Sequence, residues 1–257
     1  MVVAGIDIGI ENTKVVVMKD GCIIGLSTVS TGGIDRPEQA LRSYQDALDS
    51  AGIDAGDMDI VTATGKGKYD VPFASSVISE TTAAALAARH YFPEASGVMA
   101  VGADETIAVT LDNGRLIREY AINQKCSAGL GTFLKHLAMR LELTQAQAGN
   151  CDIPGAGIIN EGCVVFSELD ALSLLNSGAP CESIMSSAIK AAAARAATVY
   201  NDLTIPPAGG GVVLIGGLAK NRAFVKALEK YLAFEFLICE NAEYCGAVGA
   251  ALRGEEN

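Results

Sequence analysis

The chain has 257 residues, of which 50% are hydrophobic, so it can bury a large core in two compact lobes. Its net charge of −11 and pI near 4.6 disfavour nucleic acid as a partner, because a phosphate backbone needs a basic binding surface. The start at Met1 lacks a signal peptide, and no apolar run is long enough to cross a bilayer. We therefore expect a cytoplasmic protein without a membrane partner, whose seven cysteines are thiols or metal ligands rather than disulfides.

Residues 2–18 have the pattern of a β-hairpin with a polar, glycine-containing turn. An apolar strand runs into Asp7, Gly9 lies in the turn, and Thr13 and Lys14 begin a β-branched strand. In such a turn a phosphate group can reach backbone N–H groups at the glycine, while the Thr and Lys side chains donate to its oxygens. The Asp7 carboxylate is suited to hold the water shell of Mg²⁺. An ordinary hairpin turn is the alternative interpretation of so short a motif.

The same pattern returns once, at a constant spacing of 93 residues. The matching pairs are Gly9 and Gly102, Thr13 and Thr106, Val16 and Val109, and Gly21 and Gly114. Two such hairpins, each followed by helices, predict two similar α/β lobes, at residues 1–96 and 97–243, that face one another across a ligand cleft. The second copy differs at two chemically important places, since Ala100 stands where Asp7 does and Ile107 where Lys14 does.

The remaining elements follow from periodicity, caps and breakers. Strands are expected at 22–30, 59–65, 212–215 and 234–239, and helices at 36–52, 81–92, 130–141, 164–175, 184–203, after Asn221 and at the C-terminus. Ser79 is the expected N-cap of the second helix. Glu80 lies in that helix's first turn, where a carboxylate interacts favourably with the helix dipole. Residues 66–69 predict a mobile basic loop, for which simple solvation is the plainer interpretation, and residues 149–157 predict a Gly/Pro-rich loop.

The cysteines divide into two groups by their settings. Cys126 and Cys163 each lie where a helix begins or where a glycine-containing turn leads into one, and helix N-termini stabilise thiolates. No Cys-x-x-Cys motif provides a local four-ligand site. An iron–sulfur cluster needs four thiolates. One chain offers only two cysteines in such settings, whereas two chains around a two-fold axis would offer four. The cysteines with ordinary settings are interpreted as structural: Cys22, Cys151, Cys181 and Cys239.

Several segments together resemble a known superfamily. The two hairpins resemble the phosphate loops of the acetate kinase, sugar kinase, heat-shock chaperone and actin superfamily of ATPases. Residues 79–85 are similar to its connecting helix, 215–221 to its adenosine motif and 244–250 to its final helix. Residues 123–131 and 162–168 resemble more closely one branch, the ATP-dependent activators of 2-hydroxyacyl-CoA dehydratases and the ATPase subunits of benzoyl-CoA reductase.

The resemblance implies an α/β fold of two actin-like, ribonuclease H-like lobes around an ATP cleft, with the helix at 244–257 returning to the first lobe. It implies ATP or ADP with Mg²⁺ as ligands, catalytic roles for Asp7 and Glu80, and a Glu80 carboxylate that orders the metal's water shell or the attacking water. The residues expected to bind the nucleotide are Gly9, Asn12, Thr13, Lys14, Gly102, Ala103, Thr106, Gly129, Gly131, Gly216, Gly217, Lys220 and Asn221.

The resemblance also implies a single [4Fe–4S] cluster shared between two subunits, with Cys126 and Cys163 as ligands. ATP hydrolysis would then drive low-potential electron transfer in anaerobic metabolism. The implied partners are a second similar subunit in a homodimer or heterodimer, an iron–sulfur dehydratase or reductase, and an electron donor such as ferredoxin or flavodoxin.

The second hairpin departs from the family's usual pattern. Activators usually have an Asp and a Lys where this chain has Ala100 and Ile107. Asp104 or Glu105 is the candidate to substitute for the missing carboxylate, and Asp104 is taken as the catalytic candidate. Two alternatives stay open: a small-molecule kinase of the same fold, and a regulatory subunit that does not hydrolyse ATP.

Overall fold

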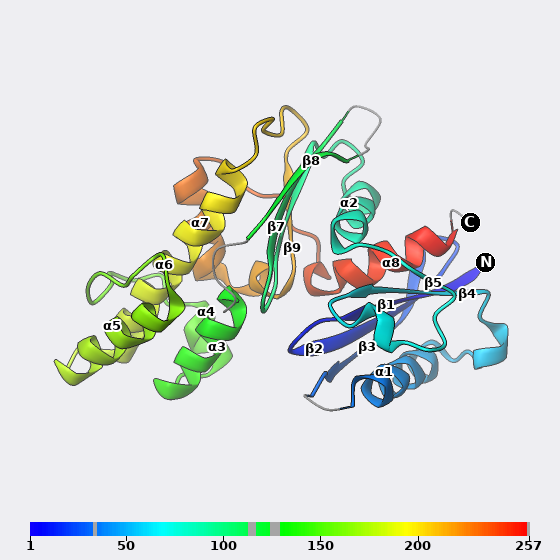
Figure 1. The fold of residues 1–257 in the computed structure, drawn as a ribbon, viewed down its shortest axis with the longest axis horizontal. Helices are drawn as coiled ribbons and strands as arrows, with labels where there is room; N and C mark the ends of the chain where they lie inside the picture. The colour runs from blue at the N-terminus through cyan, green and yellow to red at the C-terminus, as the bar shows by residue number, and fades with distance from the viewer. Residues whose placement is uncertain (33–34, 113–116, 124–128, 256–257) are drawn as a thin grey trace. The chain divides into compact units, whose positions relative to one another are not determined.

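The computed structural model describes residues 1–32, 35–112, 117–123 and 129–255 (Figure 1). They form two compact units. The first unit comprises Met1–Ala95, Leu111–Ile117 and Cys239–Asn257, and the second comprises Ser96–Thr110 and Arg118–Ile238. The domain boundaries expected from the sequence, 1–96 with 244–257 and 97–243, stay a prediction.

The first unit is built on a mixed five-stranded sheet in the order β3-β2-β1-β4-β5. Its strands are β1 (Val2–Ile8), β2 (Asn12–Lys19), β3 (Cys22–Ser30), β4 (Ile60–Gly65) and β5 (Ser76–Val77). Its helices are α1 (Arg36–Ala51), α2 (Glu80–Tyr91) and α8 (Cys245–Glu255), with 3₁₀ turns η1 (Ala55–Asp57), η2 (Lys68–Asp70) and η4 (Ala242–Tyr244). The central strand β1 pairs antiparallel with β2 and parallel with β4.

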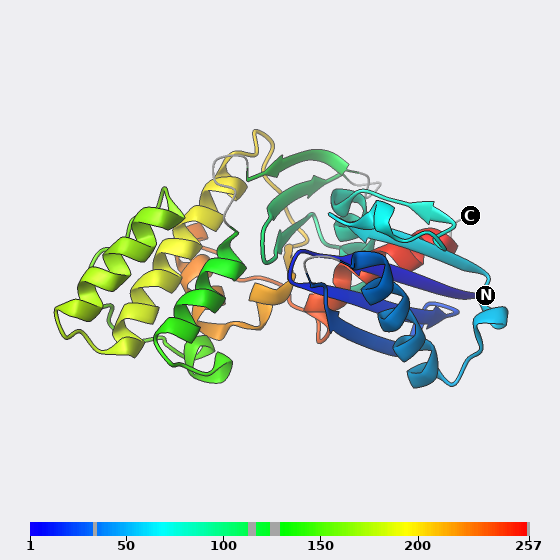
Figure 2. The same cartoon turned by 60° about the horizontal axis from the view of Figure 1, so that its bottom comes forward.

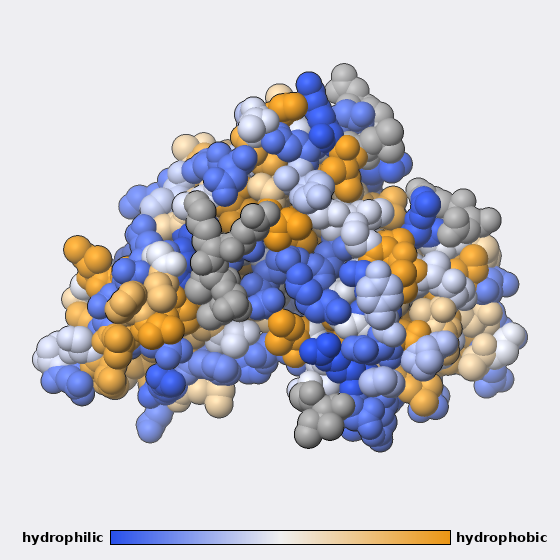
Figure 3. Space-filling model, in the orientation of Figure 1, coloured by the Kyte–Doolittle hydropathy of each residue, from blue (hydrophilic) through white to orange (hydrophobic). Residues whose placement is uncertain are grey.

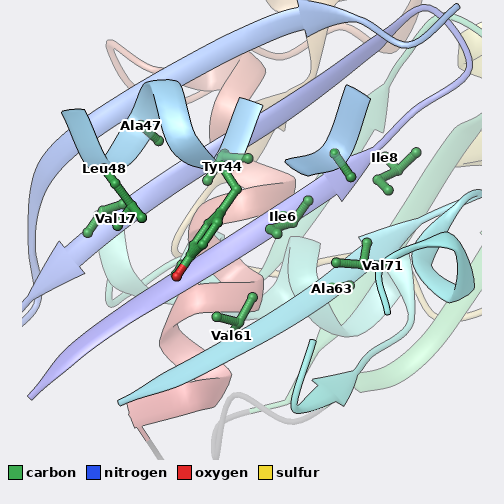
Figure 4. Packing of buried hydrophobic residues seen from close by; sticks show 12 residues of the cluster. Ile6, Ile8, Val17, Tyr44, Ala47, Leu48, Val61, Ala63 and Val71 are labelled. Carbon is green, nitrogen blue, oxygen red and sulfur yellow. The ribbon is translucent and has the colours of Figure 1, made fainter. Parts of the chain in front are cut away.

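The alternation of β1 decides what each face of this sheet carries. Ala4, Ile6 and Ile8 belong to the apolar cluster with α1, and Figure 4 shows Tyr44 of that helix directed at the sheet and Leu48 beside Val17 of β2. The residues between them face the other way, because successive side chains of a strand point to opposite sides. A Cβ at Gly5 would meet the Ala247 carbonyl of α8 at 1.8 Å, so α8 lies directly against this face.

Local signals set the ends of the first two helices. The Asp35 side chain caps α1 by accepting from the Glu38 N–H, and Gly52 closes it in the left-handed conformation with φ 65°. The Ser79 hydroxyl accepts from the Thr82 N–H at 3.0 Å and caps α2. These caps satisfy backbone groups that have no partner within the helix.

The second unit has a four-stranded sheet in the order β8-β7-β6-β9. Its strands are β6 (Gly97–Val101), β7 (Thr106–Leu111), β8 (Ile117–Ile122) and β9 (Val212–Ile215). Its helices are α3 (Leu130–Arg140), α4 (Gln145–Gly149), α5 (Val164–Asn176), α6 (Cys181–Asn201) and α7 (Arg222–Leu232), with the 3₁₀ turn η3 (Gly217–Lys220). As in the first unit, the central strand β6 pairs antiparallel with its hairpin partner and parallel with a later strand.

Helix α6 is the packing centre of the helical part of this unit. Helices α3, α5 and α7 all contact it, and α3 and α5 lie beside it in both ribbon views (Figure 2). Its buried residues include seven alanines, whose small side chains let neighbouring helices approach closely. Within the described ranges no helix combines the length and the apolar character that crossing a bilayer requires.

Three expectations about elements need correction. Residues 234–239 do not form a strand: only Leu237 bridges to Val213, while the Phe236 N–H donates to the Glu229 carboxylate instead of a neighbouring strand. The loop expected at 149–157 begins one residue later, because Gly149 is the last residue of α4 (Gln145–Gly149). Residues 66–69 are anchored, since the Gly67 N–H donates to the Ile8 carbonyl at 3.1 Å and Lys66 pairs with Glu80 at 3.5 Å.

Candidate functional site

The first hairpin is held in shape by its backbone and by a hydroxyl pair. Its turn closes with a hydrogen bond from the Gly9 N–H to the Asn12 carbonyl at 3.1 Å. The buried Thr13 hydroxyl lies 3.1 Å from that of Thr31, which donates to the Gly9 carbonyl at 2.9 Å. The buried Thr13 hydroxyl therefore stabilises the turn through Thr31.

Asp7 lies at the end of β1, on the face covered by α8. It stands directly opposite Lys14 in the β1–β2 ladder, and the Lys14 Nζ lies 3.9 Å from its Oδ2. Both side chains are about one-fifth exposed or less, at 19% and 17%. The carboxylate therefore lies at the edge of solvent with one cation beside it, a setting in which a divalent metal can reach its oxygens.

Two glycines leave room for this carboxylate. A Cβ at Gly65 would lie 2.6 Å from the Asp7 Oδ1, and one at Gly246 would lie 2.6 Å from its Oδ2. Gly65 ends β4 with φ 87°, and Gly246 is in the first turn of α8. The sequence analysis did not assign either glycine to this role. The only signal for it was that Gly65 ends β4, the strand that pairs parallel with β1.

The second hairpin repeats the backbone of the first. The Gly102 N–H donates to the Glu105 carbonyl at 2.9 Å, the counterpart of the Gly9 bond. Thr106 is buried, with 1% of its surface exposed, as Thr13 is. Ala100 and Ile107 stand opposite one another in the β6–β7 ladder, where the first hairpin has its carboxylate and ammonium. The turn is thus conserved within the chain without its charged pair.

The start of α3 packs directly on this second turn. A Cβ at Gly129 would lie 1.8 Å from the Ala103 carbonyl oxygen, and one at Gly131 would lie 2.7 Å from that of Gly102. The Thr132 N–H donates to the Ala103 carbonyl at 3.0 Å. The structure therefore brings together four residues predicted to bind nucleotide: Gly102, Ala103, Gly129 and Gly131. Asp104 is half-buried in the same turn, and its catalytic role stays a prediction.

The predicted adenosine segment follows β9. Gly216 has φ 96°, and a Cβ there would lie 2.5 Å from the Val101 carbonyl, so only glycine fits. Gly217 is exposed with open space around it, and Lys220 is exposed at the end of η3. Asn221 caps α7, and its Oδ1 accepts from the Phe224 N–H at 2.9 Å. Its side-chain amide N–H₂ is the group that a ligand could still use.

Glu80 opens α2 directly after the Ser79 cap, as expected. Its Oε2 lies 3.5 Å from the Lys66 Nζ, and both side chains are partly exposed, at 24% and 41%. The pair fixes the carboxylate at the helix N-terminus, where its charge is also favoured by the dipole. Its role in ordering a metal or a water stays a prediction.

Of the two proposed cluster ligands, Cys126 and Cys163, the structure describes only Cys163. Cys163 is half-buried at the N-cap of α5, and its N–H donates to the Asn160 Oδ1 at 2.8 Å. Cys126 lies outside the described residues. Within the described part of the chain, no group of three or more His, Cys, Asp and Glu side chains is arranged to hold a metal ion.

The outer face of α5 is unusually apolar for a surface. Five large hydrophobic side chains on this helix are 37–65% exposed: Val165, Phe166, Leu169, Leu172 and Leu175. Figure 3 shows apolar side chains gathered over this region. Contiguous exposed patches of this kind mark interaction surfaces in proteins.

Comparison with known proteins places this geometry in a family. Residues 4–254 match the model of the BadF/BadG/BcrA/BcrD ATPase family. An activator of lactoyl-CoA dehydratase from Anaerotignum propionicum is 31% identical over 260 residues, which cover all of this chain and 98% of that protein.

Two solved structures agree closely with the fold. The (R)-2-hydroxyglutaryl-CoA dehydratase component A from Acidaminococcus fermentans superposes with a TM-score of 0.89 at 29% identity, covering 98% of this chain and 97% of that one. The activator of 2-hydroxyisocaproyl-CoA dehydratase from Clostridium difficile, solved with bound ADPNP, gives 0.89 at 27% identity, covering 100% and 95%. The fold is therefore the actin-like α/β ATPase fold expected from the two hairpins, and the chain belongs to the BadF/BadG/BcrA/BcrD ATPase family.

Proposed function

We propose that this chain is an ATP-hydrolysing iron–sulfur protein that drives low-potential electron transfer to a partner CoA-thioester dehydratase or aromatic-ring reductase. The observation that carries the proposal is the setting of Cys163. This half-buried residue occupies the N-cap position of a helix whose outer face is apolar and exposed, so the proposed metal–thiolate site and the proposed protein contact would coincide. A lone structural cysteine needs neither feature.

The first hairpin fits a magnesium-bound phosphate. Its turn offers backbone N–H groups beside Gly9, Lys14 offers a cation, and Asp7 offers partly exposed carboxylate oxygens. When phosphate binds, Lys14 would neutralise its charge, while the close packing of Gly65 and Gly246 keeps the Asp7 carboxylate in place. The second hairpin offers the same backbone without a charged pair, so it would bind phosphate through backbone N–H groups alone.

The cysteine chemistry fits a cluster held by two chains. Since the described residues of one chain hold no multidentate metal site, Cys163 needs thiolates from elsewhere: Cys126 of its own chain, and the same two residues of a second subunit. A [4Fe–4S] cluster bound in this way supplies one-electron transfer at low potential.

The apolar face of α5 supports an assembly. Burying five exposed hydrophobic side chains on one helix is favourable at about 25 cal/mol per Å² of apolar area. We propose that a second similar subunit, identical or not, joins near Cys163, and that the redox partner docks on the resulting pair. The names of the relatives support a CoA-dehydratase partner, since two of them are described as activators of such enzymes. A ferredoxin or flavodoxin is the proposed electron donor.

The test is iron and acid-labile sulfide per chain in anaerobically purified protein. A cluster shared in a symmetric dimer predicts about two irons per chain. Cys163→Ser should remove the iron while leaving nucleotide binding intact. Cys181→Ser is the matched control, because Cys181 is also half-buried at the first turn of a helix. Iron-free wild-type protein, never exposed to oxygen, would overturn the cluster and leave an ATPase fold with a cysteine at a helix N-cap position.

A further inference from the structure

The fold brings together two cysteines that the sequence placed in unrelated roles. The Sγ atoms of Cys239 and Cys245 lie 3.3 Å apart, although Cys239 was interpreted as structural and Cys245 as part of the final helix. The turn η4 folds the intervening chain back so that α8 begins at Cys245 beside Cys239. Both residues are buried, but Cys239 retains 9% of its surface while Cys245 retains none. An approaching reagent therefore meets Cys239 first.

The surroundings make the two thiols unequal. A hydrogen bond from the Cys245 thiol, followed by backbone N–H groups of Cys239 and Asn241, lowers the pKa of Cys239 despite burial and the nearby Glu243 carboxylate. The same hydrogen bond, together with burial, raises the pKa of Cys245. The pair therefore loses its first proton from Cys239, which leaves a thiolate next to a thiol. This is the arrangement of an attacking and a resolving cysteine.

A third group faces the pair from α2. The Tyr91 hydroxyl oxygen is buried and has no hydrogen-bond partner among the described residues. The pKa of this phenol is raised mainly by burial, and further by Cys245, Cys239 and Glu240, which places it beside the dithiol. A buried hydroxyl without a hydrogen-bond partner destabilises the folded protein by the free energy of its desolvation. Here the hydroxyl can donate to a thiolate or to an oxidised sulfur, which would offset that cost.

We propose that Cys239 and Cys245 form a redox-active dithiol, which hydroperoxides or small disulfides oxidise to an intrachain disulfide. The two sulfurs need to come only about 1.3 Å closer to reach the bond length of about 2.05 Å. Gly246, which follows Cys245, packs on the Asp7 carboxylate, the proposed metal-holding group. One cysteine of the dithiol is therefore the sequence neighbour of a residue that contacts this carboxylate.

The chemistry balances with either oxidant. With a hydroperoxide, the Cys239 thiolate attacks the outer oxygen and the O–O bond breaks, giving a sulfenic acid and, after protonation, water or an alcohol. The Cys245 thiol then attacks that sulfur, the S–S bond forms, and the sulfenic oxygen leaves as water with the thiol proton. With a small disulfide, Cys239 forms a mixed disulfide and releases one thiol, and Cys245 releases the second. In each case the dithiol loses two electrons and two protons.

The test uses one feature of the sequence. Trypsin releases residues 231–253 as one peptide, because no Lys or Arg lies between Lys230 and Arg253, and its only cysteines are Cys239 and Cys245. The full-length chain is treated with hydrogen peroxide or glutathione disulfide, then denatured and alkylated with N-ethylmaleimide before digestion. The expected peptide lacks two hydrogens and takes up no maleimide, and after chemical reduction it takes up two.

The exposed Cys22 and a set of variants provide the controls. If the peptide still takes up two maleimides at a dose that oxidises Cys22, or if its cysteines become sulfinic acids without a disulfide, the proposal is wrong. Cys245→Ser should remove the disulfide and leave Cys239 open to further oxidation. Cys151→Ser, at a buried thiol elsewhere, should leave the peptide's oxidation unchanged. The wild-type result decides the question even if a variant fails to fold.

Discussion

The two glycine hairpins share a backbone but not a chemistry. In both, the glycine N–H closes the turn on a carbonyl three residues later, at 3.1 Å from Gly9 and 2.9 Å from Gly102. In both, the following Thr is buried and a glycine with positive φ ends the parallel neighbour strand. The first hairpin sets Asp7 opposite Lys14, whereas the second sets Ala100 opposite Ile107 at the same ladder position.

The difference separates what a fold needs from what a reaction needs. The turn hydrogen bond, the buried Thr and the close-packed glycines are enough to rebuild the hairpin in the second unit without an opposed Asp–Lys pair. The hairpin fold therefore does not require the charged pair of the first hairpin, and the Lys14 Nζ lies 3.9 Å from the Asp7 Oδ2, beyond hydrogen-bond distance. We infer that Asp7 and Lys14 are present for ligand chemistry.

The largest effect is expected from removing the charge of the Asp7 carboxylate in the first hairpin. Asp7→Asn keeps the shape of the side chain but removes the charge that attracts Mg²⁺, so ATP turnover should fall by about 100-fold or more. Steady-state phosphate release measures this loss. Asp46→Asn, at an exposed position on α1, is the control and should leave turnover unchanged. Equal turnover in Asp7→Asn and wild type would remove Asp7 from the mechanism.

The next largest effect is a loss of stability, expected when the close packing of α3 on the second hairpin is disturbed. In Gly129→Ala the new Cβ would lie 1.8 Å from the Ala103 carbonyl oxygen, so α3 or the turn must shift. We expect the free energy of unfolding to fall by about 2 kcal/mol, as in other overpacked sites. Urea denaturation provides the measurement. Gly217→Ala, where the Cβ meets open space, should change stability far less, and equal losses would mean that the close contact is not limiting.

A smaller effect tests whether the charged pair can be transplanted. Ile107→Lys alone buries an ammonium at a position that is 4% exposed, and should destabilise the protein. Adding Ala100→Asp places a carboxylate directly opposite it. We expect the double mutant to recover about 1 kcal/mol relative to the sum of the single changes. Purely additive losses in denaturant unfolding would show that this ladder position does not support an ion pair.

The smallest effect concerns the cation of the first hairpin. Lys14→Gln removes a charge that would neutralise phosphate, so KM for ATP should rise about five-fold with little change in kcat. The rise should shrink at high salt, because the side chain is partly exposed to solvent. Lys19→Gln, on the same strand but at its exposed end, is the matched control. A change confined to kcat would instead assign Lys14 to the chemical step.

The sequence predicted features that depend on neighbouring residues. The hairpins, the Ser79 cap of α2, the Asn221 cap of α7 and the position of Cys163 at a helix start follow from local turn and capping chemistry. The internal repeat then indicated two related units.

Features that depend on tertiary contacts were not predicted. Gly246 reaches Asp7 because α8 returns to the sheet of the first unit, and Cys245 reaches Cys239 because η4 folds the intervening chain back. The strand expected at 234–239 failed for a similar reason. The Glu229 side chain accepts from the Phe236 N–H, and the Phe234 and Phe236 rings meet edge to face, so most of the segment packs without joining the sheet.

The most direct measurement is ATP turnover by the purified chain, with Mg²⁺ and without it. If the Asp7–Lys14 pair of the first hairpin suffices for catalysis although the second hairpin lacks such a pair, the chain should release phosphate in a Mg²⁺-dependent reaction, despite Ala100 and Ile107. Stoichiometric ATP binding without phosphate release would contradict this claim, and would indicate a nucleotide-binding subunit that does not hydrolyse ATP.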